Sequence, residues 1–135
     1  MGDKEEFMTR VTDLYRFEAI QGHLGWDQET IMPAKGAKAR GEILAWLAGQ
    51  RHSRLIDKEM GELISNLEGE GHDDYFNANL KEMRRKYDEA VKLPTEFVSE
   101  FTKARSEALI AWQKARSESD FSQFAPHLQN LIDLT

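Results

Sequence analysis

Residues 73–94 read DDYFNANLKEMRRKYDEAVKLP and carry the clearest structural signal of the chain. Apolar side chains recur there at steps of three and four residues, which is the spacing of one face of an α-helix. They are Phe76, Leu80, Met83, Tyr87, Ala90 and Val91. Asp73 or Asp74 can cap the start of this helix, and Leu93-Pro94 ends it. The stretch therefore predicts a helix that buries one face.

The opposite face of this helix is charged. Acids and bases stand four residues apart in three pairs, which are Glu82 with Lys86, Arg84 with Asp88, and Arg85 with Glu89. Each such pair stabilises a helix by about 0.2–0.5 kcal/mol. Because the basic cluster Lys81, Arg84, Arg85 and Lys86 is interleaved with acids, we interpret it as a solvated helix face.

Helical periodicity dominates the rest of the chain, and no stretch alternates in the manner of a strand. We expect helices at about 7–24, 37–53 and 94–115, a short one capped by Asp57, and a last one from Pro126. Gly25 and residues 33–36 interrupt the pattern, 69–72 form a loop, and 120–124 form a turn. The fold class predicted is all-α, an irregular bundle of five to six helices in a single domain, residues 1–135.

Some helix positions predict how the bundle packs. Ala104, Ala108 and Ala111 are small, so a neighbouring helix can approach that part of the chain closely. Trp46 and Trp112 lie on apolar stripes and are expected in the core. Trp26 stands in the interrupted stretch between Gly25 and Pro33, where we expect a loop and assign it no role.

Composition excludes several kinds of partner. The chain has 24 acidic and 18 basic residues and a net charge of −6, which disfavours binding to nucleic acid or to an anionic membrane. No apolar run approaches the roughly 20 residues of a membrane-spanning helix. The charged N-terminus is unlike a signal peptide, and cysteine is absent. We expect a cytoplasmic protein.

Metal-binding patterns are scarce. The four histidines are never three or four residues apart, and the His-Glu-x-x-His motif is absent. His72, Asp73 and Asp74 form the only local cluster that could hold a divalent ion. A polar loop with a helix cap is the favoured interpretation, because three adjacent residues rarely converge on one ion.

Paired carboxylates for acid–base catalysis are the other candidate site. Glu18, Asp27 and Glu29 could supply them. Asp27 and Glu29 are two residues apart, so on a helix they point to different sides, and structural roles near the helix end are favoured. We therefore predict no catalytic, cofactor-binding or metal-binding residue in this chain.

Residues 24–30, LGWDQET, followed by Met32-Pro33, resemble a signature near the start of the carboxypeptidase Taq family of metallocarboxypeptidases. Later stretches resemble the same family in the same order and cover nearly the whole chain. They are Ala39-Arg40 with Ile43-Leu44, residues 61–63, residues 79–85, Leu93-Pro94, residues 106–108, Ala111-Trp112 with Ala115-Arg116, and Asp120-Phe121 with residues 124–128.

The resemblance implies a mostly helical fold like the N-terminal region of neurolysin-like metallopeptidases. It also implies a parent enzyme that releases C-terminal amino acids from peptides with zinc or cobalt and forms homodimers. The His-Glu-x-x-His motif and the other metal and substrate motifs of the family match no position among these 135 residues. The chain alone is therefore predicted to be inactive and to hold no metal.

Two functions follow as hypotheses. The first is a non-catalytic N-terminal helical domain of a longer metallocarboxypeptidase, whose partners are the C-terminal catalytic region and a second copy, and which meets peptide substrate only in the full-length enzyme. The second is a stand-alone interaction or oligomerisation module that has lost the peptidase region. The first predicts an apolar surface where the missing part packs, and the second predicts a polar surface.

Overall fold

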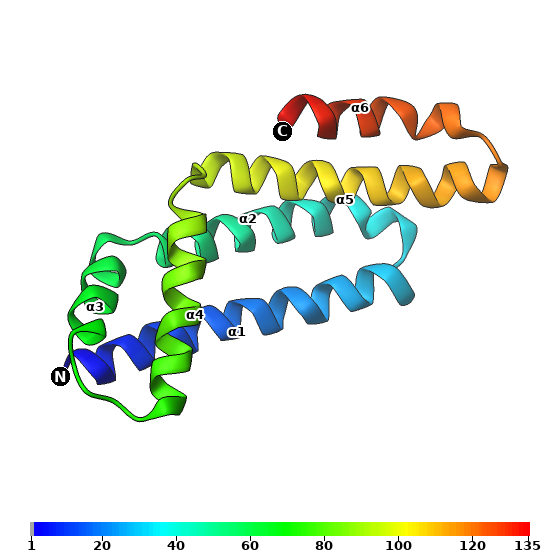
Figure 1. Cartoon of the computed structure of the whole chain (residues 1–135). Coiled ribbons are helices and arrows are strands. Elements are labelled where there is room, and N and C mark those ends of the chain that lie inside the picture. The colour runs from blue at the N-terminus through cyan, green and yellow to red at the C-terminus, as the bar shows by residue number, and fades with distance from the viewer. Residues whose placement is uncertain (1) are drawn as a thin grey trace.

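The computed structural model describes residues 2–135, and these form six α-helices and two short 3₁₀ turns without a strand (Figure 1). In chain order they are α1 (Asp3–Thr30), η1 (Ala34–Gly36), α2 (Ala37–Leu55), α3 (Lys58–Glu68), α4 (Asp74–Ala90), α5 (Thr95–Glu118), η2 (Phe121–Gln123) and α6 (Ala125–Leu134). The all-α bundle predicted from the periodicity is confirmed.

Four of the helices form one layer. Helices α1, α2, α5 and α6 lie side by side in that order, each antiparallel to the next (Figure 1). Helix α3 packs on α1, and α4 packs on α3 and on α2, at the end of the layer near the N-terminus. The main contacts of α5 and α6 within residues 2–135 are with α2, with η2 and with each other. One end of the layer is therefore covered and the other is not.

The covered end, which we call the closed half, consists of residues 3–14 of α1, the C-terminal end of α2, and helices α3 and α4. Its core contains the four largest fully buried side chains, Phe7, Met60, Ile64 and Leu67. Phe76 packs edge-on against Phe7, with ring centroids 5.7 Å apart. Burying an apolar side chain of this size contributes about 1.5–3 kcal/mol, so this cluster stabilises the fold.

The other end, which we call the open half, consists of residues 20–31, residues 37–49 of α2, α5, η2 and α6. Small side chains dominate its buried positions on α2 and α5, as expected for two closely approaching helices. A methyl group on Gly49 would overlap the Ser99 hydroxyl, and one on Gly41 would lie 3.4 Å from Ser106 Cβ. Helix α6 contributes no buried residue. Small contact residues hold the layer together but enclose little apolar volume.

Large apolar side chains of the open half are exposed instead. They are Ile20, Trp26, Ile31, Ile43, Trp46, Trp112, Phe121, Leu128 and Ile132. The expectation that Trp46 and Trp112 lie in the core was wrong, since they are 62% and 46% exposed. Ala108 and Ala115, on the stripe of Trp112, are buried, as is Leu47 beside Trp46, so each stripe is covered only in part and its tryptophan lies on the exposed part.

The first helix is longer than the sequence predicted. Helix α1 continues through Gly25 to Thr30, so Trp26 lies on a helix and not in a loop. A glycine inside a helix costs only about 1 kcal/mol, which tertiary contacts offset. The helix ends where the amides of Ile31 and Met32 both donate to the Asp27 carbonyl oxygen.

Aspartates cap three of the elements. Asp57 accepts from the Glu59 amide at the start of α3, and Asp73 accepts from the Phe76 amide at the start of α4. That hydrogen bond from Phe76 lowers the pKa of the Asp73 carboxyl. At the predicted turn after α5, hydrogen bonds from Ser122 and Gln123 lower the pKa of Asp120. The predicted caps and the turn are confirmed.

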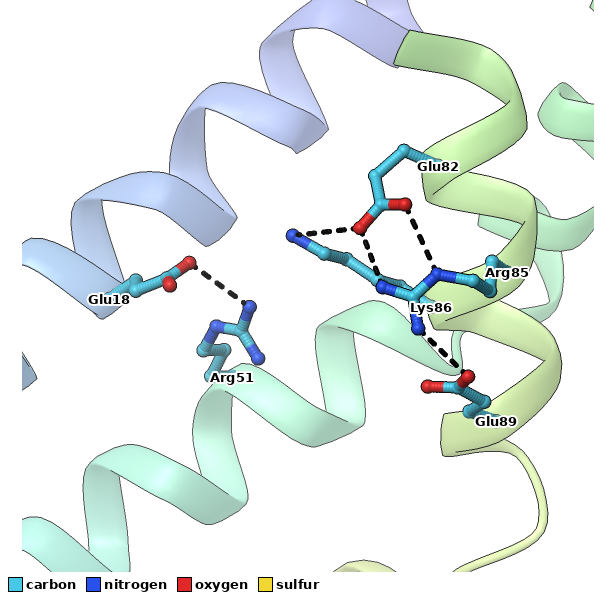
Figure 2. Close-up of polar contacts among 6 residues, drawn as sticks. All are labelled: Glu18, Arg51, Glu82, Arg85, Lys86 and Glu89. Carbon is cyan, nitrogen blue, oxygen red and sulfur yellow. Dashed lines mark hydrogen bonds and ion pairs between the residues drawn. The ribbon is translucent and has the colours of Figure 1, made fainter. Parts of the chain in front are cut away.

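Figure 2 shows a group of charged side chains on α1, α2 and α4, where the closed half ends. Arg51 on α2 lies 3.4 Å from the Glu18 carboxylate on α1. On α4, Arg85 contacts Glu82 at 2.7 Å and Glu89 at 2.9 Å, and the hydrogen bonds with Glu82 hold the pKa of Arg85 above its usual range. All three predicted pairs of α4 form. None of the described helices has both the length and the apolar character needed to cross a membrane.

Candidate functional site

The predicted cluster of His72, Asp73 and Asp74 is divided among structural roles. The His72 ring donates from Nε2 to the Leu67 carbonyl at 3.1 Å and packs on Phe76. Asp73 caps α4, and Asp74 is the first residue of that helix. Within residues 2–135 no group of three or more histidine, aspartate or glutamate side chains is placed to hold a metal ion. The residues present do not fit a catalytic metal.

The three candidate carboxylates do not converge. Glu18 binds Arg51, whereas Asp27 binds Arg40 near the opposite end of α2. Nine residues along α1 separate Glu18 from Asp27, which is about 14 Å along the helix axis. Glu29 is exposed and forms an ion pair with neither Arg40 nor Arg51. These three residues therefore form no pair of neighbouring carboxylates for acid–base work.

His52 is a buried polar residue to which the sequence assigned no role. Its Nδ1 lies 2.8 Å from the Thr95 hydroxyl, and its Nε2 lies 2.9 Å from the Ala90 carbonyl oxygen. A neutral ring that donates from Nε2 and accepts at Nδ1 satisfies both partners. His52 thus joins α2 to the connection between α4 and α5, which is a structural role.

The signature segment of residues 24–30 forms the last turns of α1, and Arg40 fixes its position. The Arg40 guanidinium donates to the Leu24 carbonyl at 2.6 Å and to the Asp27 carboxylate at 2.7 Å. Its side chain is only 16% exposed. A cation near the carbonyl end of a helix is stabilising, and the ion pair with Asp27 adds to it. Sequence reasoning missed this contact, because the partners are 13 residues apart across a turn.

Beside this segment lies a groove of about 500 Å³ between α1 and α5, which we call the α1–α5 groove. The residues that matter most along it are Gln28 and Glu29 from α1, Arg105, Leu109 and Trp112 from α5, and Leu131 from α6. The three α5 residues follow one another at steps of four and three, so one face of that helix forms a wall. The signature segment forms the facing wall.

Gln28 is the unusual residue of this groove. It is 8% exposed, and its Nε2 is buried without a hydrogen-bond acceptor within residues 2–135. Arg105 and Glu29 are exposed and take part in none of the ion pairs found among these residues. A mixed apolar and polar groove of this kind is suited to binding a polypeptide segment.

Comparison with known proteins shows which family this chain resembles. The model of the Carboxypeptidase Taq (M32) metallopeptidase family matches residues 6–135. Thermostable carboxypeptidase 1 of Thermus thermophilus is 35% identical over 114 residues, which cover 82% of this chain and 22% of the relative. Carboxypeptidase 1 of Bacillus subtilis is 29% identical over 133 residues, which cover 96% of this chain and 26% of the relative.

Solved structures give the same result. The crystal structure of BsuCP superimposes with a TM-score of 0.93 at 25% identity, over 98% of this chain and 27% of that protein. The chain thus spans about a quarter of the length of the proteins it matches and corresponds to their N-terminal portion. Since the family match extends over almost all of its residues, this chain belongs to the carboxypeptidase Taq (M32) family of metallopeptidases.

Proposed function

We propose that residues 1–135 form a non-catalytic helical domain that completes an M32 carboxypeptidase, an enzyme that releases C-terminal amino acids from peptides. The domain is inactive alone and binds the C-terminal catalytic region of such an enzyme. The observation that carries this proposal is the open half. Stable domains need a second layer over an apolar one, and within residues 2–135 the open half has none.

The exposed side chains support a packing role over an independent one. Single exposed apolar residues are common on soluble proteins, but a set that includes Trp26, Trp46, Trp112 and Phe121 on one half indicates a surface made for contact. A stand-alone interaction module predicts a polar surface there. The relatives, which are about four times as long, have the additional chain that such a surface requires.

The metal of the proposed enzyme has to be held elsewhere. The described residues contain no suitable ligand cluster, so we propose that the remaining part of the enzyme supplies the ligands, with zinc or cobalt as the metal. We also propose that the complete enzyme is a homodimer, as the family resemblance implies. In the isolated domain, the uncovered open half favours self-association. The absence of cysteine supports a cytoplasmic location.

A chimera tests this function. Residues 1–135 are joined to the part of the Bacillus subtilis carboxypeptidase 1 that follows its matched segment, and release of C-terminal amino acids from an N-blocked peptide is measured. We expect activity that a chelator abolishes and that zinc or cobalt restores. The controls are residues 1–135 alone and the Bacillus subtilis part alone.

Each control can contradict the proposal. If the Bacillus subtilis part alone is as active as the chimera, the helical domain does not complete the enzyme. If residues 1–135 alone release amino acids in a metal-dependent manner that survives repurification, the domain is itself catalytic.

A further inference from the structure

The α1–α5 groove is more specific than the rest of the uncovered surface. Two further hollows of the open half, of about 330 Å³ each, lie beside Phe121 and beside Ile110, whereas the α1–α5 groove combines Leu109, Trp112 and Leu131 with the buried Gln28 carboxamide. Two unpaired charges of opposite sign, Glu29 and Arg105, also line it. A surface that only has to exclude water needs none of these polar groups.

The buried Gln28 carboxamide lowers the stability of the isolated chain. A buried donor without an acceptor loses about 1–3 kcal/mol relative to one that is hydrogen-bonded. Gln28 is only 8% exposed, and its Nε2 reaches no acceptor within residues 2–135. Gln28 lines the groove, and its Nε2 atom has almost no accessible surface, so the carboxamide has to turn toward an occupant of the groove before it can donate to an acceptor there.

The occupant needs three properties. It presents an apolar face to Leu109, Trp112 and Leu131, a hydrogen-bond acceptor to Gln28, and polar groups to Glu29 and Arg105. A polypeptide segment supplies all three, since its backbone carbonyls are acceptors and its side chains vary in polarity. The relatives contain many residues that could supply such a segment, because this domain spans only 27% of the solved structure that it matches with a TM-score of 0.93.

We propose that the α1–α5 groove is the seat of a segment of the carboxypeptidase's own catalytic region, and that Gln28 donates a hydrogen bond to that segment. This inference rests on the proposed function and adds to it the place of contact and a residue that recognises the partner. Gln28 is thereby a positioning residue for the catalytic region. The signature segment of residues 24–30 has a role in this proposal, because it forms one wall of the groove in which the catalytic segment binds.

The substitution Gln28→Met separates this role from a purely structural one. Methionine has a similar shape and lacks the donor, so the isolated chain is expected to keep its melting temperature or to gain in it. In the chimera the same substitution removes a hydrogen bond worth about 1–3 kcal/mol, and in a chain of that length the melting temperature is expected to fall by about 1–3 °C. The matched control is Gln113→Met, an exposed position on α5 outside the groove, which should be neutral in both proteins.

A second variant does not depend on the buried amide. Trp112 is 46% exposed, so Trp112→Glu should leave the isolated chain folded with little change in melting temperature. In the chimera the new charge would be buried against the catalytic region, and both the melting temperature and the peptidase activity should fall. Tyr75→Glu, at an 81% exposed position in the closed half, is the control.

The outcomes distinguish the two proposals. If the chimera is active but Gln28→Met and Trp112→Glu shift it no more than they shift the isolated chain, the groove is not the seat, although the proposed function stands. If Trp112→Glu abolishes self-association of the isolated chain and leaves the chimera unchanged, the groove binds a second copy, which also overturns the inference. A chimera that folds and lacks activity contradicts the proposed function itself.

Discussion

The closed and open halves of this domain are both built from α-helices, but other helices cover the layer only in the closed half. In the closed half, α3 and α4 cover the layer, and Phe7, Met60, Ile64 and Leu67 are fully buried. In the open half no helix within residues 2–135 covers α5 and α6, and α6 has no buried residue. The difference teaches that the chain has one complete core and one apolar surface that no other part of residues 2–135 covers.

Polar residues also differ between the charged group of Figure 2 and the α1–α5 groove, although Arg51 Nε in that group is likewise buried without an acceptor within residues 2–135. Around the closed half, charged residues pair with one another, as Figure 2 shows for Glu82, Arg85 and Glu89. Along the α1–α5 groove, Gln28, Glu29 and Arg105 have no such partners within residues 2–135. Satisfied polar groups are typical of a finished surface, and an unsatisfied buried one calls for an explanation.

The largest expected difference between the halves concerns two phenylalanines. Phe7→Ala removes a fully buried ring and is expected to lower the free energy of unfolding by about 3–5 kcal/mol. Phe121→Ala removes a 64% exposed ring, and its cost is expected to stay below about 1 kcal/mol. Urea unfolding of the isolated chain followed by circular dichroism measures both. Equal costs would mean that the halves are equally packed.

Glycine substitutions are expected to differ in sign. A methyl group on Gly61 in the closed half would lie 2.7 Å from Tyr87 Cζ, so Gly61→Ala should destabilise the chain by about 1–3 kcal/mol. A methyl group on Gly25 in the open half meets nothing within 4 Å, and Gly25→Ala should stabilise α1 by about 0.5–1 kcal/mol. The same urea titrations report both values, and a stabilising Gly61→Ala would refute the packing described for α3 against α4.

The smallest effects concern two of the three capping aspartates, Asp73 in the closed half and Asp120 in the open half. Hydrogen bonds lower the pKa of Asp73 and of Asp120 in the folded chain. A depressed pKa contributes stability above the unfolded value of about 3.9, and this contribution is lost as the pH falls through the folded pKa. The stability difference between the parent chain and Asp73→Asn should therefore shrink between about pH 5 and pH 2. Asp120→Asn should show the same trend.

Carboxyl titrations by NMR check the cause of that trend directly. If Asp73 titrates at the value of an unfolded chain, its hydrogen bond with the Phe76 amide does not stabilise α4. A difference that grows as the pH falls would contradict the sign of the linkage.

Sequence periodicity predicted which residues share a helix face, and therefore most of the fold. The stripe of Phe76, Leu80 and Met83 is buried as expected, and the Asp57 and Asp73 caps form. Periodicity cannot tell whether anything covers a face, which is why the prediction failed for Trp46 and Trp112. The extension of α1 beyond Gly25 was missed because its support comes from Arg40, on another helix.

The groove was beyond sequence reasoning for a related reason. Gln28 is an ordinary polar residue in the sequence, and only the packing of α1 against the other helices buries it. The motif around it resembles the family signature, but its place beside α5 depends on the tertiary fold. The groove is lined by residues far apart in the sequence, such as Glu29 on α1 and Trp112 on α5.

The most direct test of the account is amide hydrogen exchange, compared between the isolated chain and the chimera. Without its partner, the open half should exchange through local opening well before the closed half does. In the chimera, amides of residues 20–30, α5 and α6 should gain more than tenfold protection beyond any change in α3 and α4. An equal gain in both halves, or none in the open half, would contradict the claim that the open half is the surface completed by the catalytic region.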